Sequence, residues 1–262
     1  MLRKLSEGQR RTIAHWAMEF LVVLVGVLLA LWLQELVTSA DKRSDAKVAE
    51  TAIRDELDGN LLILVMQDAV ATCRRERLDE IERRLESDGP SGPILTNSFI
   101  TGPHPPKHQA VYGFFNVDVT DTAWRSAIAN DSASAMEPER FRSIADIYAT
   151  FDAVRKALAS DGEAADTLEV LSYDVPLTPE LRGSLIKAYY KAHANLGFLT
   201  EGLSARAIAE QMRRLGWNDE KHLDALINGA KRDMSGFGFS LKPCAKPFVN
   251  PFAPTQVVPK KI

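Results

Sequence analysis

FLVVLVGVLLALWL, residues 20–33, is the stretch of sequence that decides how this chain is organised. Its 14 residues include no charged or strongly polar side chain. Extending it to residues 16–37 gives 22 residues with a tryptophan near each end. Three polar residues interrupt the extended segment near its termini: Glu19, Gln34 and Glu35. About 20 apolar residues cross the hydrocarbon core of a bilayer as a helix, and tryptophan favours the two interfaces, so residues 16–37 are predicted to form a transmembrane helix.

Basic residues ahead of this segment predict its orientation. Arg3, Lys4, Arg10 and Arg11 precede it, and positively charged flanks tend to stay in the cytoplasm. Residues 1–15 are therefore predicted as a cytoplasmic tail, with the chain from residue 38 onward outside the cytoplasm. In a bacterium this describes a single-pass protein of the inner membrane with a periplasmic domain.

A cleaved signal peptide is the rival interpretation, because it also has an apolar run after a basic region. Two features favour the anchor. The only small-residue site after the run is a poor one, residues 38–40, and Glu19 interrupts the passage from the basic to the apolar region. A buried core helix of a soluble protein is a third alternative, which the basic flank disfavours.

Composition restricts the classes of partner. The chain of 262 residues is 45% hydrophobic, enough for one main domain beside the membrane segment. Its 32 Lys and Arg residues against 35 Asp and Glu residues give a net charge of -3, which argues against nucleic-acid binding. Lipid and protein are the expected partners.

The chain after the anchor has a helical pattern. Residues 41–88 contain no proline, and their apolar residues recur at steps of three or four: Ile53, Leu57, Leu61, Leu64, Leu78, Ile81 and Leu85. We expect the membrane helix to continue into this helix with little break. The charges around Arg77 and Glu80 are predicted to lie on a solvated face.

The remaining chain divides into a long loop, further helices and a tail. Residues 89–120, rich in Gly and Pro, are predicted as a long connection, with a short strand or apolar strap at 111–119. Helices are predicted at 121–129, 138–158, 164–171 and 218–231, and from Thr178, where a capping hydroxyl precedes Pro179. This last helix extends to residue 215 unless Gly197 and Gly202 break it. Residues 234–262 contain several prolines and are predicted as a non-helical tail that wraps the domain or is disordered.

The predicted fold class is thus mainly α. A single N-terminal transmembrane helix continues into an extracytoplasmic helical bundle, residues 38–233, with a long Pro/Gly-rich loop and the tail 234–262.

Four blocks of sequence resemble the bacterial family called domain of unknown function 6090. They are the anchor at 18–35, AIRDELDGNL at 52–61, TAWRSA at 122–127, and the helix 141–148 that ends in an aromatic residue. The glycine usual after the helix of Trp124 is replaced here by Asn130 and Asp131. The resemblance implies a membrane-anchored helical architecture and carries no catalytic residues.

Residues that could support catalysis are sparse. His104 and His108 bracket a proline-rich turn but make an incomplete metal ligand set, so no metal or cofactor is predicted. Together with Asp118 and Asp121 they form the only cluster to consider for a hydrolase. His193 and His222 are predicted as packed or surface residues, and no G-x-S-x-G nucleophile motif occurs.

Within the span, Glu19, Gly26 and Ala30 are the candidates for helix packing. Gly26 and Ala30 form a small-xxx-small pair that lets two helices approach closely. An ionisable group such as Glu19 at membrane depth either finds a partner or reaches the headgroups. With the apolar stripe at 53–64, the pair predicts weak self-association; a membrane protein partner is the alternative.

Cys73 and Cys244 are the only cysteines. The predicted topology puts both in an oxidising compartment, where two cysteines of an exported chain are usually paired. We therefore predict a disulfide that pins the tail to the first helix of the domain, with two free thiols as the alternative.

Three functions remain in order of preference. The first is a membrane-anchored, non-enzymatic interaction or sensory protein. The second is an accessory subunit of a membrane protein complex, which would require the sequence of the span itself. The third is a hydrolase with a dispersed site in residues 104–121.

Overall fold

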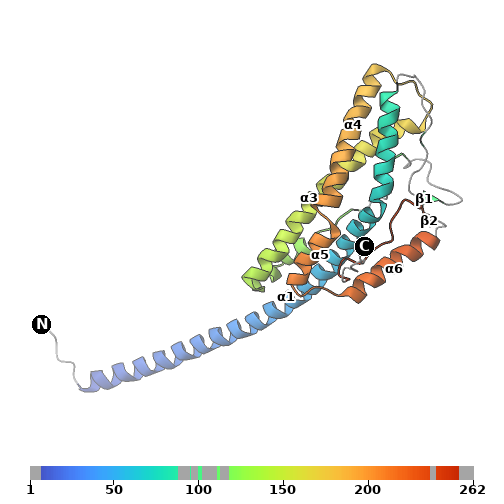
Figure 1. Cartoon of the computed structure of the whole chain (residues 1–262). Coiled ribbons are helices and arrows are strands. Elements are labelled where there is room, and N and C mark those ends of the chain that lie inside the picture. Colours follow the sequence, from blue (N-terminus) through green and yellow to red (C-terminus); the bar gives the residue numbers. More distant parts are fainter. Residues whose placement is uncertain are drawn as a thin grey trace, which may run out of the picture.

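A computed structural model describes residues 7–87, 95, 100–101, 111–112, 118–236 and 240–253. These residues are mainly helical (Figure 1). The elements in chain order are α1 (Glu7–Glu86), β1 (Ile100–Thr101), α2 (Thr122–Ala129), η1 (Ser132–Ala135), α3 (Pro138–Leu168), η2 (Glu169–Ser172), α4 (Pro179–Gly197), η3 (Phe198–Gly202), α5 (Ala205–Arg214), α6 (Glu220–Gly236) and β2 (Ser240–Leu241).

The first helix, α1, forms a projecting arm with its N-terminal part and belongs to the domain with its C-terminal part. Its 80 residues correspond to about 120 Å at 1.5 Å per residue. Figure 1 shows the N-terminal part projecting as a gently curved arm, while the C-terminal part runs among the other helices. From residue 18 onward, Ala46 is the first buried residue along α1. The prediction of a mainly helical chain with one long apolar N-terminal helix is confirmed.

The core forms along the domain half of α1. Ile53, Leu57 and Leu61 are fully buried in a cluster that also contains residues of α3, α5 and α6. A second cluster joins Leu78 and Ile81 of α1 to α4 and the end of α3. The periodic stripe predicted from the sequence is therefore the face on which the rest of the domain packs.

The third helix is continuous where the sequence predicted two pieces. α3 runs from Pro138 to Leu168 and passes through Gly162 without a break, so the predicted gap at residues 159–163 is wrong. A glycine inside a helix costs only about 1 kcal/mol relative to alanine. Burial of Ala164 and Leu168 and the ion pair of Asp161 with Arg74 outweigh that cost.

The helix predicted from Thr178 begins as expected and ends at the first glycine. Thr178 Oγ1 accepts a hydrogen bond from the Leu181 amide at 3.3 Å, with proline in the first turn. α4 ends at Gly197, the π-helical turn η3 follows, and Ser204 caps α5. Of the two outcomes that the sequence left open, the break at Gly197 is the one that occurs.

The segments around the tail also differ in detail from the prediction. α6 continues to Gly236, so the first residues of the predicted tail, 234–236, are helical. β1 pairs antiparallel with β2, which ties part of the long loop to the tail. A strand or an apolar segment across the bundle was predicted at 111–119. Val111 and Tyr112 of this segment are buried, while residues 113–117 lie outside the described residues.

Candidate functional site

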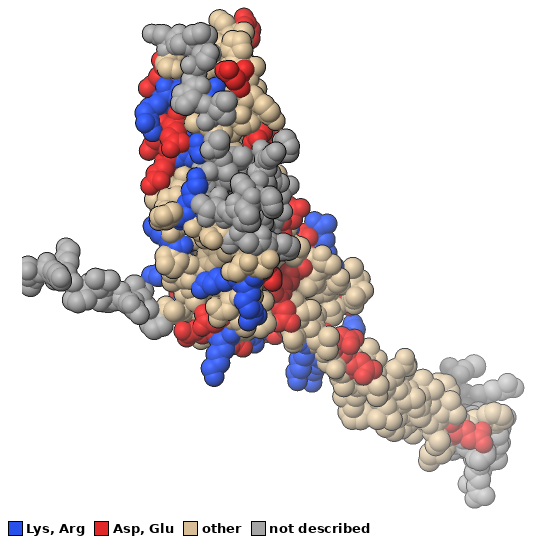
Figure 2. Space-filling view, turned by 90° about the vertical axis from the view of Figure 1, so that its right-hand side faces the viewer, with Lys and Arg blue, Asp and Glu red and all other residues tan. Residues whose placement is uncertain are grey.

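The arm of α1 is exposed at every residue of the predicted span whose burial the structure describes. Trp16, Phe20 and Trp32 are 67%, 69% and 60% exposed, and so is every side chain from residue 18 to residue 37. Figure 2 shows the arm as an almost uncharged surface, in contrast to the mixed charges of the domain. Contiguous apolar surface of this size is unfavourable in water. By length and composition α1 is a candidate membrane span.

The residues predicted to pack in the membrane lie on this arm. A Cβ added at Gly26 would meet no other atom of the described chain within 4 Å, so the space beside Gly26 is open. Glu19 and Ala30 are exposed as well. The stripe at 53–64 is different, because Ile53 and Leu64 are buried in their own domain. The part of the self-association hypothesis that relied on this stripe is therefore wrong.

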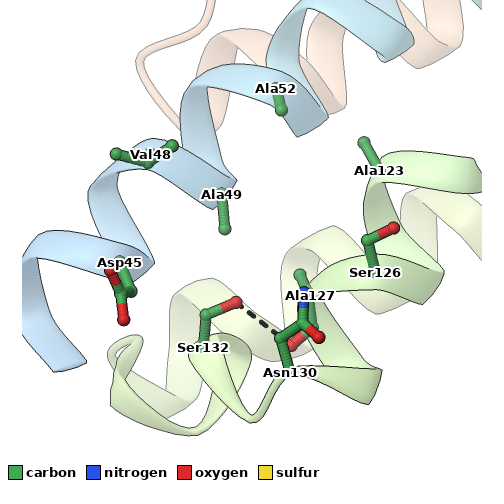
Figure 3. A pocket seen from close by; sticks show the side chains of 9 residues that line it. All are labelled: Asp45, Val48, Ala49, Ala52, Ala123, Ser126, Ala127, Asn130 and Ser132. Atoms are coloured by element: carbon green, nitrogen blue, oxygen red, sulfur yellow. Dashed lines mark hydrogen bonds between the residues drawn. The ribbon is translucent and has the colours of Figure 1, made fainter.

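A groove opens where α1 leaves the domain, between α1, α2 and η1 (Figure 3). Its volume is about 550 Å³, within the range of small-molecule pockets. Small side chains make it hollow, and Val48 on its rim is 69% exposed. The lining residues are Asp45, Val48, Ala49, Ala52, Ala123, Ser126, Ala127, Asn130 and Ser132. We call this the juxtamembrane groove.

A tight turn shapes the floor of the juxtamembrane groove. Asp131 has φ 59°, the left-handed conformation that glycine adopts readily and that Asp tolerates better than most residues. Ser132 Oγ donates a hydrogen bond to the carbonyl of Ala127 at 3.2 Å. Lys42 Nζ lies 3.3 Å from Asp131 and joins the turn to α1. Hydrogen bonding from Ser134 and then Lys42 lowers the pKa of Asp131.

Beside the groove, Glu56 joins α1 to α2 and α3. Its two carboxylate oxygens accept hydrogen bonds from the Ala123 amide at 2.9 Å and from the Tyr148 hydroxyl at 2.6 Å. Trp124 stacks on Tyr148 with ring centroids 5.3 Å apart, and it also contacts Phe141 at 5.3 Å. Three of the blocks on which the family resemblance depends thus meet in one junction, a proximity that sequence alone did not reveal.

The cluster considered for a hydrolase is only partly described. His104 and His108 lie outside the described residues. Asp121 forms ion pairs with Arg125 at 2.8 Å and Arg155 at 3.3 Å, and Asp118 is exposed. Within the described ranges, no three His, Cys, Asp or Glu side chains are grouped to hold a metal ion.

The two histidines predicted on helices have different surroundings. The His193 ring on α4 lies 6.1 Å from the Tyr189 ring. His222, near the start of α6, faces the buried carboxylate of Asp58 at 3.8 Å.

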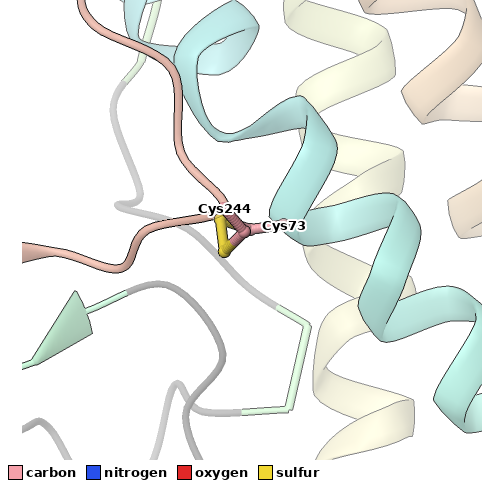
Figure 4. The surroundings of a disulfide bond; sticks show 2 residues. All are labelled: Cys73 and Cys244. Atoms are coloured by element: carbon pink, nitrogen blue, oxygen red, sulfur yellow. A yellow bond between two sulfur atoms is a disulfide. The ribbon is translucent and has the colours of Figure 1, made fainter.

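The predicted cysteine pair joins α1 to a segment of the tail. Figure 4 shows Cys73 projecting from α1 toward the tail segment that carries Cys244, and the two sulfurs are at disulfide distance, 2.06 Å. Beyond it, the Lys246 amide donates to the Ala69 carbonyl at 2.8 Å. Phe248 and Phe252 are buried in the core. We call residues 242–253 the strap.

Asn250 joins the strap to α6. Its side-chain amide donates to the Glu220 carbonyl and to the Asp224 carboxylate, both at 2.9 Å, and its oxygen accepts from the Phe252 amide. Asn250 is itself buried. Since Leu223 and Ile227 of α6 are also buried, α6 and the strap cover one side of α1 together.

A buried polar cluster lies between α1 and α3, and the sequence did not predict it. The Arg74 side chain is 1% exposed and forms an ion pair with Asp161 and a 3.0 Å hydrogen bond to Gln67. Its guanidinium lies 4.4 Å from the centre of the Tyr112 ring. Burial raises the pKa of Asp161, and the charge of Arg74 opposes that rise.

Arg77 was also misassigned. Its side chain is 7% exposed, so the prediction of a solvated face is wrong there, although its ion pair with Glu80 at 2.8 Å exists. Desolvation lowers the pKa of Arg77. The sequence did contain an indication of this burial, because Arg74 and Arg77 lie one turn apart beside the apolar stripe.

Comparison with models of known protein families, with curated proteins and with solved structures finds no match to this chain. Its function is therefore inferred from its own residues.

Proposed function

We propose that the chain is a single-pass protein of the bacterial inner membrane whose periplasmic helical domain binds a protein partner close to the membrane and catalyses no reaction. The observation that carries the proposal is the continuity of α1. One helix is exposed and apolar at residues 16–37 and becomes the central core helix of the domain from Ala46 onward. The membrane anchor and the core helix of the domain are then parts of one continuous helix.

The dimensions of α1 support this arrangement. The 22 residues of the span correspond to about 33 Å of helix, close to the roughly 30 Å thickness of the hydrocarbon core. Only residues 38–44 separate the span from Asp45, the first residue of the juxtamembrane groove. From Val37 to Asp45 the helix rises by about 12 Å. A partner bound in the groove would therefore lie next to the headgroups and is itself expected to be membrane-attached.

The character of the juxtamembrane groove favours a protein partner. Four alanines give it apolar walls, and serine and asparagine side chains lie among them (Figure 3). A partner side chain that fills such a hollow buries apolar area, while the polar groups at the rim select its orientation. In a sensory role, a conformational change caused by binding in the groove would be transmitted toward the membrane through the same helix.

Two alternatives remain open. An accessory subunit would need the sequence of the span itself, since its partner would contact Gly26 and Ala30. A hydrolase would need a free carboxylate in the cluster of residues 104–121, and both ion pairs of Asp121 count against that role there. A distant relationship to domain of unknown function 6090 is also proposed, supported by the meeting of its resembling blocks around Glu56.

Photo-crosslinking tests the proposed function. A crosslinking amino acid replaces the exposed Asn130 at the rim of the groove in the full-length protein in its native membrane. We expect an adduct with a membrane protein, lost when Ala52→Phe fills the groove and retained with Ala149→Phe, which adds the same side chain at an exposed position of α3 outside the groove. An adduct that persists in Ala52→Phe, or no adduct at all, rejects the groove as the binding site.

Exchanging the span separates the two membrane hypotheses. Residues 16–37 are replaced by an unrelated apolar helix of the same length, which leaves the groove unchanged. The interaction protein keeps its adduct, whereas an accessory subunit that recognises the span loses it.

A further inference from the structure

Asp58 is a buried charge with an incomplete set of partners. Its side chain, on the core half of α1, is 3% exposed, and Oδ2 has no hydrogen-bond partner among the described residues. A buried carboxylate without a partner is costly, since it has lost the hydrogen bonds that water would provide. Such a group persists in a fold only where something offsets the cost or where a proton relieves it.

The charged groups around Asp58 come from α1 and from the start of α6. His222 Nε2 lies 3.8 Å from Asp58 Oδ2, too far for a good hydrogen bond but close enough for an ion pair when the imidazole is protonated. Arg54, one turn before Asp58, pairs with Asp219 at 3.0 Å. Asp219 in turn accepts the His222 amide at 3.0 Å, and Asp55 adds a further negative charge nearby.

We propose that Asp58 and His222 form a proton-operated contact that fastens α6 and the strap to α1 as the pH falls. When Asp58 is unprotonated, a desolvated negative charge lies at the α1–α6 interface, and Oδ2 accepts no hydrogen bond from the described residues. A proton on the Asp58 carboxyl removes this charge. α6 and the strap respond together because Asn250 bonds the strap to the first turns of α6.

The direction of the pH effect follows from the environment of Asp58. Burial raises the pKa of Asp58 from 3.8 to about 6, and His222 and then Arg54 oppose the rise. Because the pKa is higher when α6 is docked than when the carboxyl is exposed, protonation favours docking. The stabilisation is complete below the ordinary pKa and is lost as the pH rises through about 6. Docking is therefore tighter at pH 5 than at pH 8.

Hydrogen exchange of the full-length protein in detergent micelles tests the contact. Protection of the α6 amides, corrected for the intrinsic pH dependence of exchange, should increase about tenfold between pH 8 and pH 5, the change expected for one group whose pKa rises to about 6 on docking. The α4 amides in the same sample serve as the reference. Asp58→Asn should abolish the increase, and Glu76→Gln, which removes an exposed carboxylate on the same helix that does not act on Asp58, should keep it.

His222→Gln tests the second partner. Because His222 lowers the pKa of Asp58, its removal should move the pH midpoint of the change in α6 protection to a higher pH. The proposal is overturned if Asp58→Asn keeps the wild-type increase, or if His222→Gln superimposes on the wild type. It does not rest on the proposed partner of the juxtamembrane groove.

Discussion

Cys73 and Cys244 are 171 residues apart in sequence, yet their Cα atoms lie 5.1 Å apart. This is within the range of about 4.4–6.8 Å that a disulfide requires. The pair closes the strap over α1 and encloses most of the domain between its two ends.

Removing both sulfurs should destabilise the domain. For the double variant Cys73→Ser, Cys244→Ser we expect a loss in the free energy of unfolding of up to about 5 kcal/mol, because the unfolded chain gains the freedom of a large loop. Urea unfolding measures it, and reduction of the wild type should reproduce the effect. Alkylation followed by non-reducing mass analysis should leave both thiols unlabelled; labelling of both in protein from its native compartment would show that they are not paired.

Two adjacent arginines provide a matched test of burial. Asp161→Ala leaves Arg74 buried and without its carboxylate, which should lower the free energy of unfolding by about 3–5 kcal/mol. Glu201→Ala removes the carboxylate partner of the neighbouring, half-exposed Arg75, and should cost less than about 1 kcal/mol. Equal losses in the two variants, measured by urea unfolding, would contradict the assignment of Arg74 to the core.

The junction at Glu56 predicts a specific role for one hydroxyl. Tyr148→Phe keeps the stacking on Trp124 but removes the 2.6 Å hydrogen bond to the carboxylate, so the free energy of unfolding should fall by about 1–3 kcal/mol. Tyr190→Phe is the control, since Tyr190 is 66% exposed, and should change stability by less than about 0.5 kcal/mol. A neutral Tyr148→Phe variant would mean that water replaces the hydroxyl at no cost.

Self-association through the span should depend on Gly26. We expect weak dimers of the full-length protein in mild detergent, because the open space beside Gly26 admits a second helix. Gly26→Leu should abolish them, while Val27→Leu, about 100° around the helix, should not. Sedimentation in detergent measures the dimer fraction. A monomeric wild type would reject the prediction.

The protein should remain in the membrane at full length. We expect it to resist alkaline extraction and a C-terminal reporter to be active only outside the cytoplasm, because Arg3, Lys4, Arg10 and Arg11 precede the span. A soluble product whose N-terminus begins near Asp41 would instead identify residues 1–40 as a cleaved signal.

Local patterns in the sequence were sufficient for most helices. Steps of three and four between apolar residues predicted the domain half of α1, and the pairing of Thr178 with Pro179 located the start of α4. These signals lie within one or two turns of the chain, so they can be read without knowing the fold. The glycines gave an ambiguous signal, since Gly162 is accommodated in α3 whereas α4 ends at Gly197.

Such local patterns do not predict contacts between segments that are distant in the sequence. The burial of Arg74 depends on Asp161, 87 residues later, and the junction at Glu56 depends on Tyr148, 92 residues later. The contact of Asp58 with His222 is of the same kind. None of these pairs has a sequence spacing that favours it over many others.

The sequence by itself determined the apolar segment, its basic flank and the helical class, because hydrophobicity and helical periodicity are properties of neighbouring residues. It also singled out Cys73 and Cys244, since no other cysteine was present to pair with either. Only the tertiary structure decided which charges are buried, where the groove opens and which faces of α1 remain free. Those properties arise when α3, α4, α6 and the strap close on α1, and they depend on side chains that the chain brings together from far apart.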